Sequence, residues 1–119
     1  MGCHADSSWL IALLDAEDHH HKEAVSQLAK LGSVPAMSAI ALGEILSSFE
    51  SHRRVRFKKL SAGFEIVPVD AEVAAKAAEI RVENRIALGD AIIIASALIH
   101  DTELLTFDKR MQSVFERLR

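Results

Sequence analysis

The chain has 119 residues, enough for one domain and too few for two, so a single domain over residues 1–119 is expected. Half of the residues are apolar, and only two Pro and five Gly occur, which excludes disordered and collagen-like classes. The single cysteine, Cys3, excludes a disulfide-stapled secreted domain and favours a reducing cytoplasm. A net charge of −3 removes global positive charge as an argument for nucleic-acid binding, although local patches stay possible.

The first half of the chain alternates short strand patterns with helical ones. Residues 2–5 predict a strand that is weak by propensity, because its residues are mostly small or polar. The apolar stretch 9–14 predicts a short helix, and residues 24–31 repeat apolar side chains at helical spacing. Residues 34–37 predict a second strand, and the spacing over 42–49 predicts an amphipathic helix.

The second half continues the alternation. Its predicted elements are, in order, a basic helix over 53–59, a strand over 64–69, a helix over 70–84, an apolar helix over 91–99 capped by Asp90, a strand over 104–106 and a helix from Asp108. The apolar helix is about half the length of the ~20 residues that a membrane span needs, so a buried core helix and no membrane association are expected. Strands that alternate with helices predict an α/β fold, a short parallel sheet with helices on both faces.

Three aspartates and one glutamate occupy positions where a parallel sheet collects ligands, at the carboxyl ends of its strands. Asp6 and Asp108 follow the first and last predicted strands, Asp90 begins the apolar helix, and Glu44 lies in the helix after the second strand. Converging carboxylates repel one another, and a divalent cation relieves that repulsion. Mg²⁺ prefers such oxygen ligands and can activate water at a phosphoryl centre, which suggests phosphodiester hydrolysis.

Each acid also has an ordinary structural interpretation. Asp6, Asp90 and Asp108 are all good helix N-caps, and capping is the commoner role of an isolated Asp at such a position. Glu44 lies opposite the apolar stripe of its helix and could simply be solvated. The positions of the four acids together are therefore suggestive, and no single one establishes a site.

Taken together, these segments resemble the PIN-domain ribonucleases, and most closely the VapC-type toxins of toxin–antitoxin pairs. The matching segments, in the family's order, are DSSWLIALL (6–14), DHH (18–20), SAIALGEI (38–45), ALGDAIIIASA (87–97) and ELLTFDKRM (103–111). Each motif is short and degenerate by itself, and their order in a chain of this length makes the resemblance more specific.

The resemblance implies a three-layer α/β/α sandwich and a Mg²⁺- or Mn²⁺-dependent endoribonuclease. By position, Asp6, Glu44 and Asp90 match the family's metal-binding acids, and Asp108 matches a fourth, less uniform acidic position. Ser8 and Thr106 match small hydroxyl positions beside the acids. The resemblance also implies RNA as substrate, a homodimer, and a VapB-like antitoxin as partner.

A basic segment and a histidine triplet lie outside the acidic motifs. The segment places five of the fourteen basic residues within seven positions, namely Arg53, Arg54, Arg56, Lys58 and Lys59. It could contact RNA phosphates or an acidic antitoxin segment, or it could be a solvated helix face. Residues 19–21 are three consecutive histidines, and we expect a solvated helix start there, because adjacent helical residues do not share a face.

Two other classes of function stay open from the sequence. A phospho-acceptor receiver domain has a similar size, a parallel sheet and an acidic Mg²⁺ site, and Asp70 and Lys109 follow predicted strands. The paired acids that receiver domains place after their first strand are missing at Asp6-Ser7. A non-catalytic RNA- or protein-binding domain would use the basic segment without turnover or metal dependence.

Overall fold

A four-stranded parallel sheet organises the computed structural model. The structure describes residues 2–48 and 50–119, except for the side chains at four positions in 51–60. The strands are β1 (Cys3–Ala5), β2 (Ala36–Ser38), β3 (Ile66–Val67) and β4 (Glu103–Leu105). The helices are α1 (Ser7–Leu14), α2 (His21–Lys30), α3 (Ala39–Ser48), α4 (Ser51–Ser61), α5 (Ala71–Asn84), α6 (Leu88–Ile99) and α7 (Lys109–Leu118). The strands run in the order β3-β2-β1-β4, so the prediction of a parallel sheet is confirmed.

The first strand, the weakest by propensity, lies at the centre of the sheet. His4 pairs with Ala36 of β2 on one side and with Leu104 of β4 on the other. His4 and Ala5 are fully buried. Ladder hydrogen bonds on both edges and burial on both faces therefore hold a segment that has little intrinsic preference for a strand.

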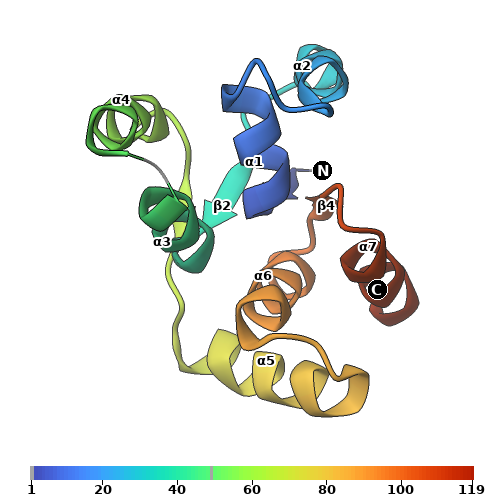
Figure 1. Ribbon diagram of the computed structural model, residues 1–119. Coiled ribbons are helices and arrows are strands. Elements are labelled where there is room, and N and C mark those ends of the chain that lie inside the picture. The colour runs from blue at the N-terminus through green and yellow to red at the C-terminus, as the bar shows by residue number, and fades with distance from the viewer. Residues whose placement is uncertain (1, 49) are drawn as a thin grey trace.

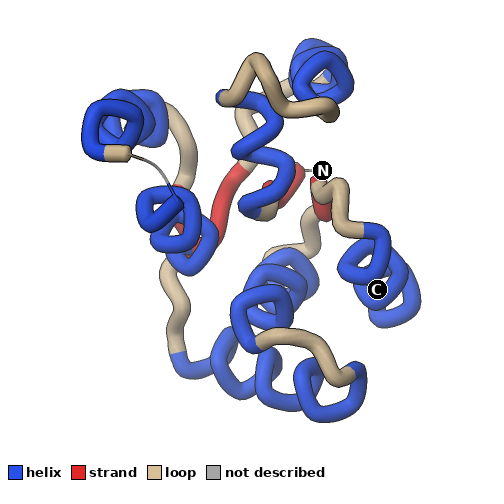
Figure 2. Tube along the Cα trace, viewed as in Figure 1, coloured by secondary structure: helices blue, strands red, loops and turns tan. Residues whose placement is uncertain are grey.

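Helices cover both faces of the sheet, which gives the expected three layers (Figures 1 and 2). One core joins α5, α6 and α7 with Leu104 of β4, and the other joins α1 and α2 with Ala5 and Met37. Helix α3 contributes to both cores, since Ala41 belongs to the first and Ile45 to the second. Helix α6 is buried over 91–97, which confirms the prediction of a core helix.

Several predicted boundaries were wrong by a few residues. The second strand begins at Ala36 rather than at Val34, because Pro35 has no amide hydrogen for the ladder and Val34 is exposed. The third strand shortens to Ile66–Val67 at the sheet edge. Helix α6 begins at Leu88, so Asp90 lies inside its first turn. Among the described residues, no helix is long and apolar enough to cross a bilayer.

A buried histidine makes this sheet sensitive to acid. Neither ring nitrogen of His4 has a hydrogen-bond partner, and its ring stacks in parallel on that of His100, with the centroids 6.4 Å apart. Burial, aided by the charge of His100, lowers the pKa of His4 from 6.5 to about 4. The unfolded chain therefore binds this proton more readily, and stability is lost as the pH falls from about 6.5 towards 4.

Replacing His4 by Phe should remove this acid sensitivity. In urea titrations, we expect the free energy of unfolding of His4→Phe, measured relative to that of the unmodified chain, to increase as the pH falls below 6.5. The steepest gain should be about 1.4 kcal/mol per pH unit, which corresponds to one proton. A difference that stays constant between pH 7 and pH 4 would contradict the assignment.

Candidate active site

Asp6 is a buried carboxylate at the point where β1 ends and α1 begins. It is 2% exposed and caps α1, since its Oδ1 accepts the Trp9 amide hydrogen at 2.9 Å. The Ser8 hydroxyl donates to the same oxygen at 2.8 Å, and the Thr106 hydroxyl donates to Oδ2. Burial raises the pKa of Asp6, these three hydrogen bonds oppose the rise, and the charge of Asp108 adds to it. The capping prediction is confirmed, and Ser8 and Thr106 lie beside the acid as expected.

The loop after β4 brings Asp108 to the same end of the sheet. The Asp6 amide donates to the Leu105 carbonyl at 3.0 Å, so the ends of β1 and β4 are joined directly. Asp108 then caps α7 by accepting the amide hydrogens of Arg110 and Met111 at 2.9 and 3.1 Å. Its carboxylate is exposed, and it acts on Asp6 through its charge.

Glu44 reaches the site from the middle of α3. Its Oε1 accepts a hydrogen bond of 2.6 Å from the Ser7 hydroxyl of α1. A Cβ placed on Gly89 of α6 would lie 3.1 Å from Glu44 Oε2, so α6 presents bare backbone to this carboxylate. Glu44 therefore lies between α1 and α6, and it is exposed to solvent, as the ordinary interpretation of a solvated glutamate expected.

Asp90 does not have the capping role that its position suggested. Ala87 is the N-cap residue of α6, and it makes no side-chain capping bond. Within the described chain, no donor hydrogen-bonds to the Asp90 carboxylate. Burial raises the pKa of Asp90, and the charges of Asp108, Glu44 and Asp6 raise it further. The structure thus brings the other three acids within electrostatic reach of Asp90.

A divalent cation fits this donor set in charge and in chemistry. The neighbouring charges that act on Asp90 are all negative, and the donors are carboxylate and hydroxyl oxygens. Among the described residues, no three or more His, Cys, Asp or Glu side chains lie close enough together to form a cage that could hold a metal ion. Mg²⁺ does not require such a cage, because one or two carboxylates together with water and substrate phosphate usually hold it.

Where Arg53 forms an ion pair, the basic helix α4 lies at the end of α1 that is far from Asp6. Arg53 approaches Asp15 at 3.7 Å, and Asp15 is the C-cap of α1, whereas Asp6 caps the other end of that helix. Eight residues of helix separate these ends, which is about 12 Å. Arg56, Lys58 and Lys59 are exposed, while the Arg54 side chain lies outside the described residues. Contact of this helix with RNA or a partner stays a prediction.

Sequence reasoning missed two residues that shape the site. Ser7 was assigned no role, although its hydroxyl binds Glu44, and Gly89 was treated only as part of a motif. The available signal was a glycine inside an apolar helix directly before an acid, since glycine in a helix marks close approach.

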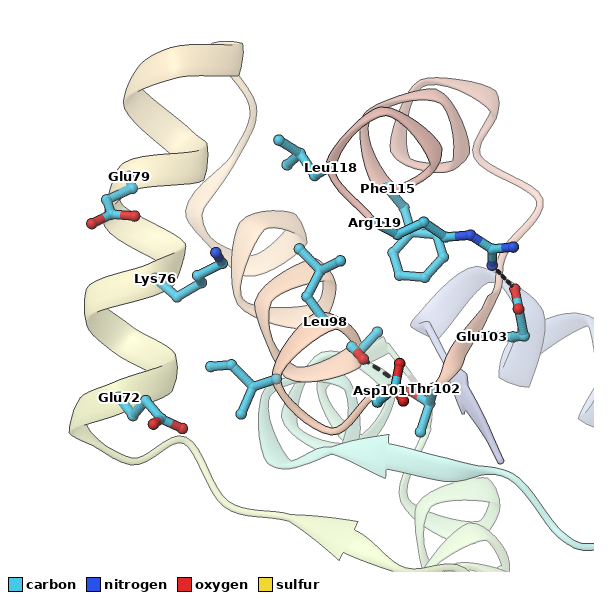
Figure 3. Close-up of a pocket in the computed structure, with 12 residues that line it drawn as sticks. Glu72, Lys76, Glu79, Leu98, Asp101, Thr102, Glu103, Phe115, Leu118 and Arg119 are labelled. Atoms are coloured by element: carbon cyan, nitrogen blue, oxygen red, sulfur yellow. Dashed lines mark hydrogen bonds and ion pairs between the residues drawn. The ribbon is translucent and has the colours of Figure 1, made fainter. Parts of the chain in front are cut away.

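A groove of about 870 Å³ lies elsewhere, between α5, the end of α6 and α7. Figure 3 shows Lys76 and Glu79 on α5 and Leu98 on α6, with Arg119 bound to Glu103 on the other side. Leu98 lies two turns along α6 from Asp90, at the end where the strands begin. The groove and the acids therefore belong to opposite ends of the sheet.

A family model and a curated relative both match most of this sequence. A family model for the PIN domain matches residues 5–116. Over 89 residues the chain is 29% identical to ribonuclease VapC10 of Mycobacterium tuberculosis, a match that covers 71% of this chain and 67% of the relative.

Solved structures share the fold. A toxin–antitoxin complex from Klebsiella pneumoniae contains a chain with 27% identity and a TM-score of 0.78, covering 88% of this chain and 85% of that one. Mycobacterium tuberculosis VapC20, a sarcin-ricin loop cleaving toxin, has a TM-score of 0.79 over 94% of both chains. Its identity is 22%, so this second likeness concerns the fold alone.

Removing the Asp90 charge should stabilise the metal-free chain. Because burial and neighbouring acids raise the folded pKa of Asp90, this group contributes a loss of stability as the pH rises through the carboxyl range. Asp90→Asn should therefore unfold at a higher urea concentration than the unmodified chain at pH 7 in EDTA, and the difference should shrink towards pH 4. Glu79→Gln, on the exposed face of α5, is the control. A less stable Asp90→Asn chain would contradict this account.

Proposed function

Because the chain belongs to the PIN domain family, we propose that it is a metal-dependent endoribonuclease, the toxin of a VapBC-type toxin–antitoxin pair. The observation that carries the proposal is the meeting of four acids at the carboxyl end of the sheet, around an Asp90 that has no capping role. The likeness to ribonuclease VapC10 supports RNA as the substrate. The chemistry is hydrolysis of a phosphodiester bond.

The family resemblance suggests different roles for the four acids. Asp6, Glu44 and Asp90 would hold Mg²⁺ or Mn²⁺, and the exposed Asp108 would contribute through water. Such an ion supplies charge neutralisation at the phosphate and a nucleophilic water at neutral pH. Ser8 and Thr106 hold the Asp6 carboxylate in one orientation, and Ser7 does the same for Glu44. Preorganised carboxylates need little reorganisation when charge develops during the reaction.

Assignment to a toxin–antitoxin pair also suggests the partners of this chain. The match to a chain of a toxin–antitoxin complex supports a VapB-like antitoxin as the inhibitor of this chain. The family resemblance supports a homodimer, and RNA as the proposed substrate fits a cytoplasmic location.

The two competing functions have less support. Asp70, the phospho-acceptor candidate, caps α5 by accepting the Val73 amide hydrogen at 2.9 Å, and the family model that matches the chain is that of the PIN domain. A non-catalytic binding domain would leave the convergence of four like charges without a use, although that convergence costs stability.

The decisive experiment is cleavage of a mixed RNA pool with Mg²⁺ or Mn²⁺. Discrete products should appear with the unmodified chain and with the Glu79→Gln control. They should vanish in EDTA, and they should fall by about 100-fold or more with Asp90→Asn, since loss of one electrostatic contact to a reacting centre has this order of effect. Cleavage that survives Asp90→Asn or EDTA would overturn the proposal, and RNA binding without turnover would favour the binding domain.

Substituting Gly89 by Ala should weaken metal binding at the site without unfolding the chain. In Gly89→Ala the new Cβ meets Glu44 Oε2 at 3.1 Å, so Glu44 must shift, whereas Gly43→Ala in α3 has no atom within 4 Å. Both substitutions favour the helix by about 1 kcal/mol, so neither should unfold the chain. Calorimetric titration should show weaker Mn²⁺ binding for Gly89→Ala only. Equal binding by the two variants would contradict a metal site that depends on this position of the Glu44 carboxylate.

A further inference from the structure

Three aromatic rings lie in succession next to the acids. The ring of His20 stacks on that of Phe107, with the centroids 4.3 Å apart and the planes 5° from parallel. The ring of His19 leans against His20 at 4.1 Å and 41°. Phe107 is the residue between Thr106, which binds Asp6, and Asp108. This group, called the ring column below, thus begins within the active-site loop and ends at an exposed histidine.

The ring column corrects the expectation for the histidine triplet. Helix α2 begins at His21, so His19 and His20 precede it and do not follow helical spacing. The loop geometry lets their rings meet, which adjacent residues inside a helix would not do.

Hydrogen bonds hold the backbone of two of the three residues in the ring column. The Phe107 amide donates to the Ser8 hydroxyl at 3.2 Å, and that hydroxyl donates to Asp6. On the other side, the His20 amide donates to Asp18 Oδ1 at 2.8 Å. A ring nitrogen of His21 lies 2.8 Å from the Ala12 carbonyl, which fixes the start of α2 to α1. The rings are therefore positioned relative to the acids before any ligand arrives.

The capping and charge contacts of His20 do not explain why its ring is there. Although His20 is the N-cap of α2, its side chain makes no capping bond. Its contact with Glu23 is 3.7 Å long between exposed side chains, and such surface pairs contribute little. Stacking on Phe107 is the contact that orients the ring.

We propose that the ring column is a stacking platform for an unpaired RNA base next to the scissile phosphate. Proteins that recognise unpaired RNA stack its bases on Phe, Tyr, Trp or His rings, and such stacking tolerates different sequences. A phosphate at the acids would place a flanking base beside Phe107, and the exposed His19 lies at the open end of the ring column. The proposal rests on the proposed function and adds to it a subsite for a base, made by the ring column.

Binding can be tested without cleavage by using the Asp90→Asn chain with Mg²⁺. The probes are fluorescein-labelled oligo(A), oligo(U) and oligo(C) of about 12 nucleotides, and an RNA duplex of the same length. Fluorescence anisotropy should show that His20→Leu weakens single-strand binding by at least about fivefold. His20→Phe should retain it, because the ring face remains and only the nitrogens are lost. The duplex should bind more weakly and respond little to either change.

His100→Ala provides the matched control. This variant removes a histidine ring that is exposed at the far end of α6, about 15 Å along the helix from Asp90. Its affinity for the probes should equal that of the parent. A second pair of variants repeats the test at Phe107. Phe107→Leu, which loses the ring, should bind single strands more weakly, and Phe107→Tyr, which keeps it, should retain the affinity. Unfolding curves should show that both variants are folded.

The outcomes separate the two proposals. Three results would overturn the stacking platform. The first is that His20→Leu binds as tightly as its parent, and the second is that His20→Leu and His20→Phe lose affinity equally. The third is that no single strand binds. The proposed function would still stand if the unmodified chain cleaves the RNA pool. The chain could instead fail to cleave the RNA pool but bind single strands in a way that depends on the His20 ring. That result would support the stacking platform and overturn the proposed nuclease function.

Discussion

The structure around the carboxyl end of the sheet depends on the burial of one charge, the carboxylate of Asp6. A buried carboxylate must be hydrogen-bonded, because leaving it bare costs several kcal/mol. The Trp9 amide, the Ser8 hydroxyl and the Thr106 hydroxyl meet this requirement. These donors come from α1 and from the loop after β4, so satisfying one charge also sets the start of a helix and the course of a distant loop. Asp108 and Phe107 are placed by that loop.

The same end of the molecule carries a stability cost that its chemistry explains. Burial and three neighbouring acids raise the pKa of Asp90, and within the described chain no hydrogen bond offsets this. A sequence selected only for stability would avoid such an arrangement, and violations of this kind are typical of functional sites. A divalent cation would turn the repulsion into attraction. The stacked aromatic rings beside the acids fit the same interpretation, since such rings suit a ligand that has both phosphate and base.

Much of the fold could be predicted because helices and buried strands leave periodic patterns. The apolar run in α6 and the stripe in α7 identified core helices whose buried residues match the prediction. Boundaries were less accurate where one residue decides them, as Pro35 does for β2. The strand β1 was predicted weakly because its residues have low strand propensity, and only its two neighbours explain its place at the centre of the sheet.

By itself, the sequence determined the order of the elements, the parallel sheet and the set of acids, since each depends on local spacing and on motifs in chain order. Only the tertiary structure decided that Asp90 is not a cap, that Gly89 lies against Glu44, and that the rings of His20 and Phe107 stack. The reason is physical. Contacts between segments far apart in the chain arise from how the sheet and helices pack, and no residue carries a local signal of which distant side chain it will meet.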